Sequence, residues 1–72
     1  MINAIISHAN GHISKHLANI EVYLNGAVGV GEHSDIMGTI TKELEMIEKY
    51  NSQIEMVQKY LESKDYQKLL KG

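Results

Sequence analysis

The sequence predicts an all-α protein: an antiparallel two-helix hairpin with helices at about residues 3–25 and 35–62 and a short C-terminal helical tail, assembling into a helical bundle as a homo-oligomer. Three observations support this prediction. Two stretches show helical spacing of apolar residues, and one glycine-rich segment separates them. The chain also has only 72 residues and no cysteine. It therefore forms one domain, residues 1–72, and we expect it to gain stability by association, because short chains without disulfides or metals bury too little apolar surface.

The first predicted helix carries one apolar stripe. Its members recur every three or four residues and so share one face of a helix: Ile2, Ile6, Ala9, Ile13, Leu17, Ile20 and Leu24. Asn25 and Gly26 follow as a plausible end of the helix, since glycine readily takes the left-handed conformation that closes helices.

The second predicted helix has a more regular stripe, in which steps of three and four alternate as in a coiled-coil seam. The stripe comprises Met37, Ile40, Leu44, Ile47, Asn51, Ile54, Gln58 and Leu61. Tyr50, Val57 and Tyr60 widen it. Ser34 is the expected N-cap, and Asp35 faces the positive end of the helix. The pattern breaks after residue 62, and the tail 63–72 is expected to add a final helical turn or two.

The distribution of charge predicts which helix is inside an assembly. Residues 1–31 contain only two charged side chains, Lys15 and Glu21, whereas residues 32–72 contain fourteen. The first helix is therefore expected inside, and a homodimeric four-helix bundle is the simplest assembly. The predicted oligomer seam is Ile6, Ile13, Leu17, Ile20, Leu24, Ile40, Leu44, Ile47, Asn51, Ile54 and Leu61. Asn51 either pairs across the oligomer interface and sets the register of the helices, or lies at the solvent-exposed edge of the seam.

Composition excludes several classes of protein. The net charge is −2 and every cation is a lysine, which argues against a nucleic-acid partner, because phosphate recognition relies on clustered cations and on arginine. No apolar run approaches the ~20 residues that span a bilayer. The first residues lack the basic start of a signal peptide. No membrane association is expected, and the predicted location is cytoplasmic, in the host cytoplasm if the protein is viral.

Three histidines form a row on the first predicted helix. His8, His12 and His16 are four residues apart, the spacing by which helices hold zinc. No Asp or Glu lies between them to complete the usual ligand set. The favoured interpretation is a row of interfacial or solvated histidines, with a metal site as the alternative. Histidines titrate near pH 6.5, so pH-sensitive association is conceivable under either interpretation.

The segment from Gly26 to Asp35 is the most distinctive part of the sequence. Its candidate ligand or partner residues are Gly29, Gly31, Glu32, His33, Ser34 and Asp35. Glycines before a helix resemble a phosphate-binding loop in outline. However, no lysine follows them and two acids would repel a phosphate. The favoured interpretation is a wide turn between the helices, with a cation site at Glu32, His33 and Asp35 as the alternative.

No arrangement of residues indicates catalysis. The tyrosines have the apolar rings and polar tips of packing residues. The chain has no cysteine, and one short hairpin offers no spacing that would bring a nucleophile and a base together. We therefore predict a protein that is not an enzyme, with no catalytic residue and no cofactor.

Three segments suggest a family. They are His16 to Leu24, Val28 to Ile36 and Glu55 to Leu61. Together they make the stretch from Lys15 to Leu61, about two-thirds of the chain, resemble short uncharacterised helical-hairpin proteins of large contractile-tailed (myovirus-type) phages of marine cyanobacteria. The resemblance implies a viral accessory protein made in an infected cell, and it implies no catalytic residue or cofactor. It also implies that a partner would contact the loop rather than the seam.

These observations favour one function and leave two alternatives. The favoured function is a small, non-enzymatic interaction or accessory protein that self-associates and binds a host or viral protein. The first alternative is a binder of a small ligand or metal ion, through loop 26–35 or the histidine row. The second alternative is a structural subunit of a virion.

Overall fold

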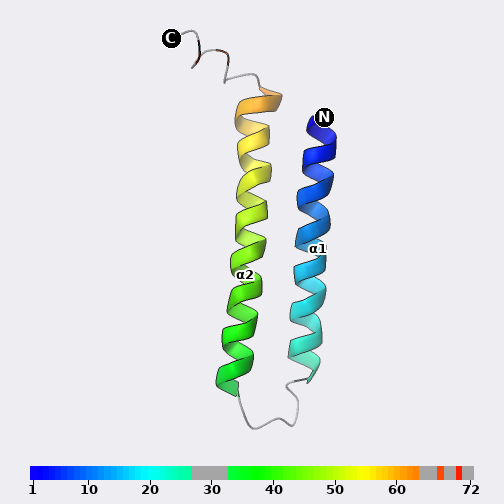
Figure 1. Ribbon diagram of the computed structural model, residues 1–72, viewed down its shortest axis with the longest axis vertical. Helices are drawn as coiled ribbons and strands as arrows, with labels where there is room; N and C mark the ends of the chain where they lie inside the picture. The colour runs from blue at the N-terminus through cyan, green and yellow to red at the C-terminus, as the bar shows by residue number, and fades with distance from the viewer. Residues whose placement is uncertain (27–32, 64–66, 68–69, 71–72) are drawn as a thin grey trace.

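The computed structural model describes residues 1–26, 33–63, 67 and 70, with the backbone alone at residues 33 and 34, and these residues are helical except for Met1 and a bend at Ser63. Helix α1 comprises Ile2–Gly26 and helix α2 comprises His33–Met56. A π-helical segment, η1 (Val57–Glu62), continues α2 without a break. The prediction of an all-α chain with two helices is confirmed (Figure 1).

The helix boundaries differ in detail from the prediction. Helix α1 is one residue longer at each end. Helix α2 begins at His33 rather than at residue 35. Ser34 is therefore the second residue of α2, and the prediction that it is the N-cap is wrong. The reason is that serine is also tolerated within the first turn of a helix. Residues 57–62 form wider turns than an α-helix, a difference that apolar spacing cannot reveal. Of the predicted tail, only Ser63, Gln67 and Leu70 are described.

Helices α1 and α2 lie side by side (Figure 1). His12 stacks on Tyr50 and His16 contacts Glu43, so residue numbers rise along α1 as they fall along α2. The Cα trace measures only 10 Å along its shortest axis, too little for a second layer of helices, since the axes of packed helices alone lie about 8–10 Å apart. Globular domains generally bury their core between two packed layers. The described helices form a single layer, and therefore have a single contact surface between them.

We call this contact surface the seam. The residues that it buries wholly or partly recur at steps of four and three: Ile2, Ile6, Ala9, Ile13, His16 and Ile20 on α1, and Ile36, Ile40, Glu43, Ile47, Tyr50, Ile54 and Val57 on α2 and η1. Ala9, with 0% exposure, and Val57, with 6%, are the only buried apolar residues among those described, and no large side chain there is fully buried. The seam is therefore a thin core.

Not every residue of the predicted stripes lies in the seam. Leu17, Leu24, Met37 and Leu44 are exposed, with between 52% and 67% of their surface accessible. On α2 two heptad patterns share Ile40 and Ile47, one through residues 37 and 44 and the other through residues 36 and 43. The structure follows the second pattern, which leaves a set of large apolar side chains outside the seam.

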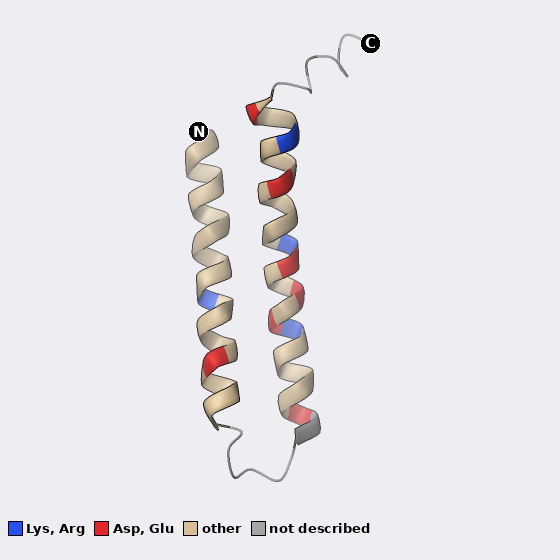
Figure 2. Ribbon diagram, turned by 180° about the vertical axis from the view of Figure 1, so that it is seen from behind, with Lys and Arg blue, Asp and Glu red and all other residues tan. Residues whose placement is uncertain are grey.

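The two helices also differ in charge. Helix α1 carries only Lys15 and Glu21, whereas acidic and basic residues recur along α2 (Figure 2). The uneven distribution seen in the sequence is thus a difference between two neighbouring helices.

Ala9 tests the tightness of the seam. Replacing it with leucine adds volume where no surface is free, so Ala9→Leu is expected to destabilise the fold by about 1–3 kcal/mol through overpacking. Ala4 is exposed on the same helix, and Ala4→Leu is expected to change stability by less than about 0.5 kcal/mol. Thermal unfolding followed by circular dichroism measures both. Equal effects of the two substitutions would contradict the arrangement of the seam.

Candidate functional site

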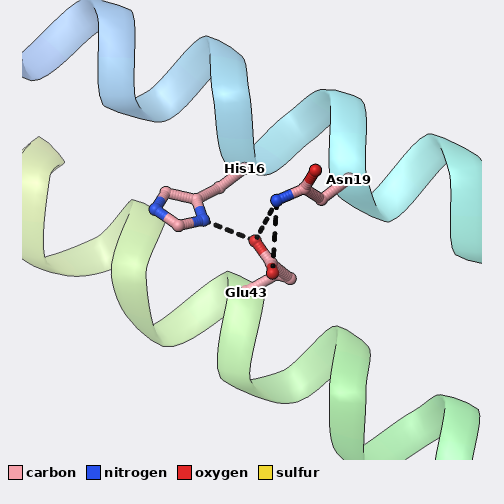
Figure 3. A network of polar contacts seen from close by, with 3 residues as sticks. All are labelled: His16, Asn19 and Glu43. Carbon is pink, nitrogen blue, oxygen red and sulfur yellow. Dashed lines mark hydrogen bonds and ion pairs between the residues drawn. The ribbon is translucent and has the colours of Figure 1, made fainter.

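A polar network lies within the seam, where apolar residues would be expected. The His16 Nδ1 atom is hydrogen-bonded to Glu43 Oε2 across the two helices (Figure 3). The Asn19 side-chain amide, one turn along α1, donates to both oxygens of the same carboxylate at 3.3 and 3.4 Å. The His16 and Glu43 side chains are only 10% and 16% exposed. One acceptor on α2 is thus held by two side chains of α1.

The heptad spacing explains why Glu43 points inward. It lies seven residues after Ile36 and seven before Tyr50, at a position of the seam. A partly buried carboxylate needs hydrogen-bond donors, because desolvation otherwise disfavours its charged form. The hydrogen bond with His16 is the largest influence on the pKa of Glu43 and lowers it, and the bond from Asn19 lowers it further, against partial desolvation that raises it. The network therefore stabilises a carboxylate inside the seam.

A ring cluster adjoins this network. The His12 ring lies parallel to the Tyr50 ring, with 4.4 Å between the centroids and 4° between the planes. His8 and His16 lie 6.4 and 6.3 Å from the same tyrosine ring. Tyr50 of α2 is therefore the centre on which the histidine row of α1 packs.

Desolvation and nearby positive charge both act on His12. Partial burial against Tyr50 is the main cause that lowers the pKa of His12. Electrostatic repulsion of protonated His12 by His8, Lys15, His16 and Lys49 lowers its pKa further. The folded state consequently binds a proton at His12 less readily than the unfolded chain does.

The structure places the three predicted histidines on one face of α1, but it does not arrange their ring nitrogens around one position that a metal ion could occupy. The centroids of His8 and His12 are 4.6 Å apart, and those of His12 and His16 are 6.4 Å apart. His16 already bonds to Glu43. No three His, Asp or Glu side chains in the described part of the chain are placed as metal ligands would be. Zinc binding by this row stays the alternative interpretation, which the structure does not test.

The predicted loop site falls almost wholly outside the description. Gly29, Gly31 and Glu32 are not among the described residues, and neither are the side chains of His33 and Ser34. Asp35 is exposed, and its carbonyl oxygen accepts a hydrogen bond of 2.9 Å from the Thr39 hydroxyl. The residues that are described enclose no pocket.

The sequence pattern singles out His16 but not its partners Glu43 and Asn19. A charged residue is normally discounted as a member of a seam, so apolar spacing favours the pattern through Met37 and Leu44. The signal that could have found Glu43 is the heptad series of residues 36, 43, 50 and 57. Asn51, in contrast, is exposed to solvent. Its side-chain amide donates a hydrogen bond of 3.3 Å to Glu55, one turn along the same helix.

No family model, curated protein or solved structure matches this chain. The resemblance to phage proteins therefore stays a prediction, and its most distinctive segment, residues 28–36, lies mostly outside the described part. None of the described helices combines the length and the apolar character needed to cross a membrane.

Glu43→Gln tests the polar network. Glutamine keeps the shape of the side chain but removes the charge that His16 and Asn19 bind, and hydrogen bonds to charged groups are the stronger kind. We expect a lower midpoint of thermal unfolding at neutral pH. Glu45→Gln, at an exposed glutamate of the same helix, is the matched control and should leave the midpoint almost unchanged. Equal midpoints for the two variants would contradict a stabilising network.

Acidification is expected to destabilise the fold in two stages. Since the native pKa of His12 is below its ordinary value of 6.5, the unfolded chain binds more protons as the pH falls below that value, and stability declines. The native pKa of Glu43 is below its ordinary value of 4.5, so its contribution, present above pH 4.5, is lost as the pH falls through the lowered pKa.

Unfolding midpoints measured from about pH 8 to about pH 4 test this expectation. His12→Gln should flatten the first decline, and Glu43→Gln should flatten the second. A wild-type midpoint that rises on acidification through both ranges would show the sign to be wrong.

Proposed function

We propose that this chain is a non-enzymatic interaction module: an antiparallel helical hairpin that self-associates into a helical bundle, most simply a dimer, and acts through protein–protein contacts. The observation that supports the proposal is the thin core. Only Ala9 and Val57 are buried apolar residues among those described, while ten large apolar side chains there are exposed. A chain with this distribution gains most of its remaining apolar burial from a partner.

The accessible surface supports the same proposal. A folded monomer of 8.1 kDa is expected to expose about 4,500 Å², whereas this chain exposes 5501 Å². The excess of about 1,000 Å² is close to the area that one partner contributes to a protein–protein interface of standard size, about 800 Å². Association would bring the exposed surface into the range of ordinary folded proteins.

The polar network fits an interaction module better than a catalytic one. Buried polar groups add little net stability but can select one register of helices over others. His16 and Glu43 are hydrogen-bonded to each other, and the Asn19 amide donates two further hydrogen bonds to the Glu43 carboxylate. We assign the network to the specificity of helix pairing. The predicted setting is cytoplasmic, in an infected cell if the phage resemblance holds, where a host or viral protein would be the further partner.

Dependence of the fold on concentration tests the proposal. Sedimentation equilibrium of the full chain is expected to show a species of at least twice 8.1 kDa. The unfolding midpoint should rise with protein concentration, because mass action favours an oligomer that only the folded state forms. A monomer that unfolds cooperatively, with a midpoint independent of concentration, would overturn the proposal.

A further inference from the structure

The two flanks of the seam are built differently. On one flank, residues next to the seam are half-buried: Ile5, His12 and Asn19 on α1, and Thr39, Met46 and Tyr60 on α2 and η1, with Gln53 as the exposed exception. The stack of His12 on Tyr50 and the bonds of Asn19 to Glu43 lie on this flank. Side chains of the chain itself thus cover one flank of the seam.

The opposite flank is exposed, and we call it the open flank. Four of its residues are apolar: Leu17, Leu24, Met37 and Leu44. Four more carry side-chain amides and are also exposed: Asn3, Asn10, Asn51 and Gln58. On each helix these eight residues are spaced by seven. Leu17 and Leu44 directly follow the contacting pair His16 and Glu43 and turn to the same side, because the two helices run in opposite directions. The other six residues lie at steps of seven from these two, so all eight share one face.

The composition of the open flank is unusual for an exposed surface of this chain. Charged residues make up 22% of the sequence, yet none of the eight positions is charged. Leu17 lies beside Leu44, and Leu24 beside Met37, because the neighbouring pair His16 and Glu43 are in contact. The open flank is therefore apolar towards the C-terminus of α1, and it is polar but uncharged towards the N-terminus of α1.

We propose that the open flank is the surface on which a second copy of this chain docks, with the two-fold axis running along the helices and the C-terminal ends of α1 of both copies at the same end. The inference rests on the proposed function and deepens it by naming the face and the register. A second copy is the occupant that the surface fits, since an uncharged face can meet itself without burying any charge.

The division of the open flank into two halves determines the orientation. With the axis along the helices, the apolar half of one copy meets the apolar half of the other, and the amides meet amides. A two-fold axis across the middle of the flank would instead place the leucines on the amides. In the inferred register, α1 of one copy packs on α2 of the other, with Leu17 against Leu44 and Leu24 against Met37.

Charges beside the open flank fit the same register. The adjoining row consists of Ser7, Ser14 and Glu21 on α1 and of Thr41, Glu48 and Glu55 on α2. When Leu17 is level with Leu44 of the second copy, Glu21 lies level with Thr41, Ser14 with Glu48 and Ser7 with Glu55. Each glutamate therefore faces a hydroxyl group and no glutamate faces another. The inferred register thus avoids the repulsion between like charges across the interface.

Glutamate substitution tests the face. Leu17→Glu places a charge in the inferred interface and should raise the dissociation constant by about tenfold or more, measured by sedimentation equilibrium. Val22→Glu is the matched control: it makes the same kind of change on the same helix, at a residue 67% exposed but outside the open flank. It should leave the dissociation constant unchanged. Helical circular dichroism at high concentration checks that both variants fold.

Disulfide trapping tests the register, and the absence of native cysteine makes the result specific. Leu17→Cys chains unfolded and refolded with Leu44→Cys chains should form a disulfide-linked heterodimer under mild oxidation. Leu17→Cys chains refolded with Met37→Cys chains should not, because position 37 lies two turns away in the inferred register. Preferential trapping of the Leu17→Cys chain by the Met37→Cys chain would overturn the inference.

The two proposals fail in different ways. A wild-type dimer that Val22→Glu disrupts and Leu17→Glu leaves intact overturns the open flank as the docking face but leaves self-association standing. A wild-type chain that is a stable folded monomer overturns both.

Discussion

A single seam between α1 and α2 constrains everything else in this structure. Two helices that lie side by side can bury only the faces that they turn towards each other, and the described helices form a single layer. Larger domains share each helix among several neighbours, so that most of its apolar side chains are covered. Here one seam must hold the helices together, and ten large apolar side chains of the described residues remain exposed outside it.

The polar network is notable because it occupies part of that limited seam. His16 and Glu43 take positions at which two apolar residues would have added to a core that has only two buried apolar members among the described residues. Replacing a buried polar pair with apolar residues is often neutral or stabilising, so stability alone does not explain the pair. Its hydrogen bonds can be made in only one register of the two helices. The network therefore lowers the possible stability of the seam but fixes the alignment of α1 and α2. This alignment determines which side chains lie on the open flank.

Much of the fold could be predicted from periodicity, but the division of the apolar residues could not. Steps of three and four located both helices to within one or two residues at most ends. The same steps were compatible with two seams on α2, because Ile40 and Ile47 belong to both. The choice of Glu43 over Leu44 depends on His16 of the other helix, 27 positions away. The pattern of one helix carries no information on such a contact, so the histidine row could be identified without its tyrosine and carboxylate partners.

The sequence by itself determined that this protein is helical, since its apolar spacing suits two helices, and that α1 is nearly free of charge. It also indicated that so short a chain without cysteine would have a small core. Only the tertiary structure decided which side chains that core contains, which flank is covered by the stack of His12 on Tyr50, and which flank is left exposed. The physical reason is that periodicity assigns a residue to a face of its own helix, whereas burial depends on the rotation and level at which two helices meet.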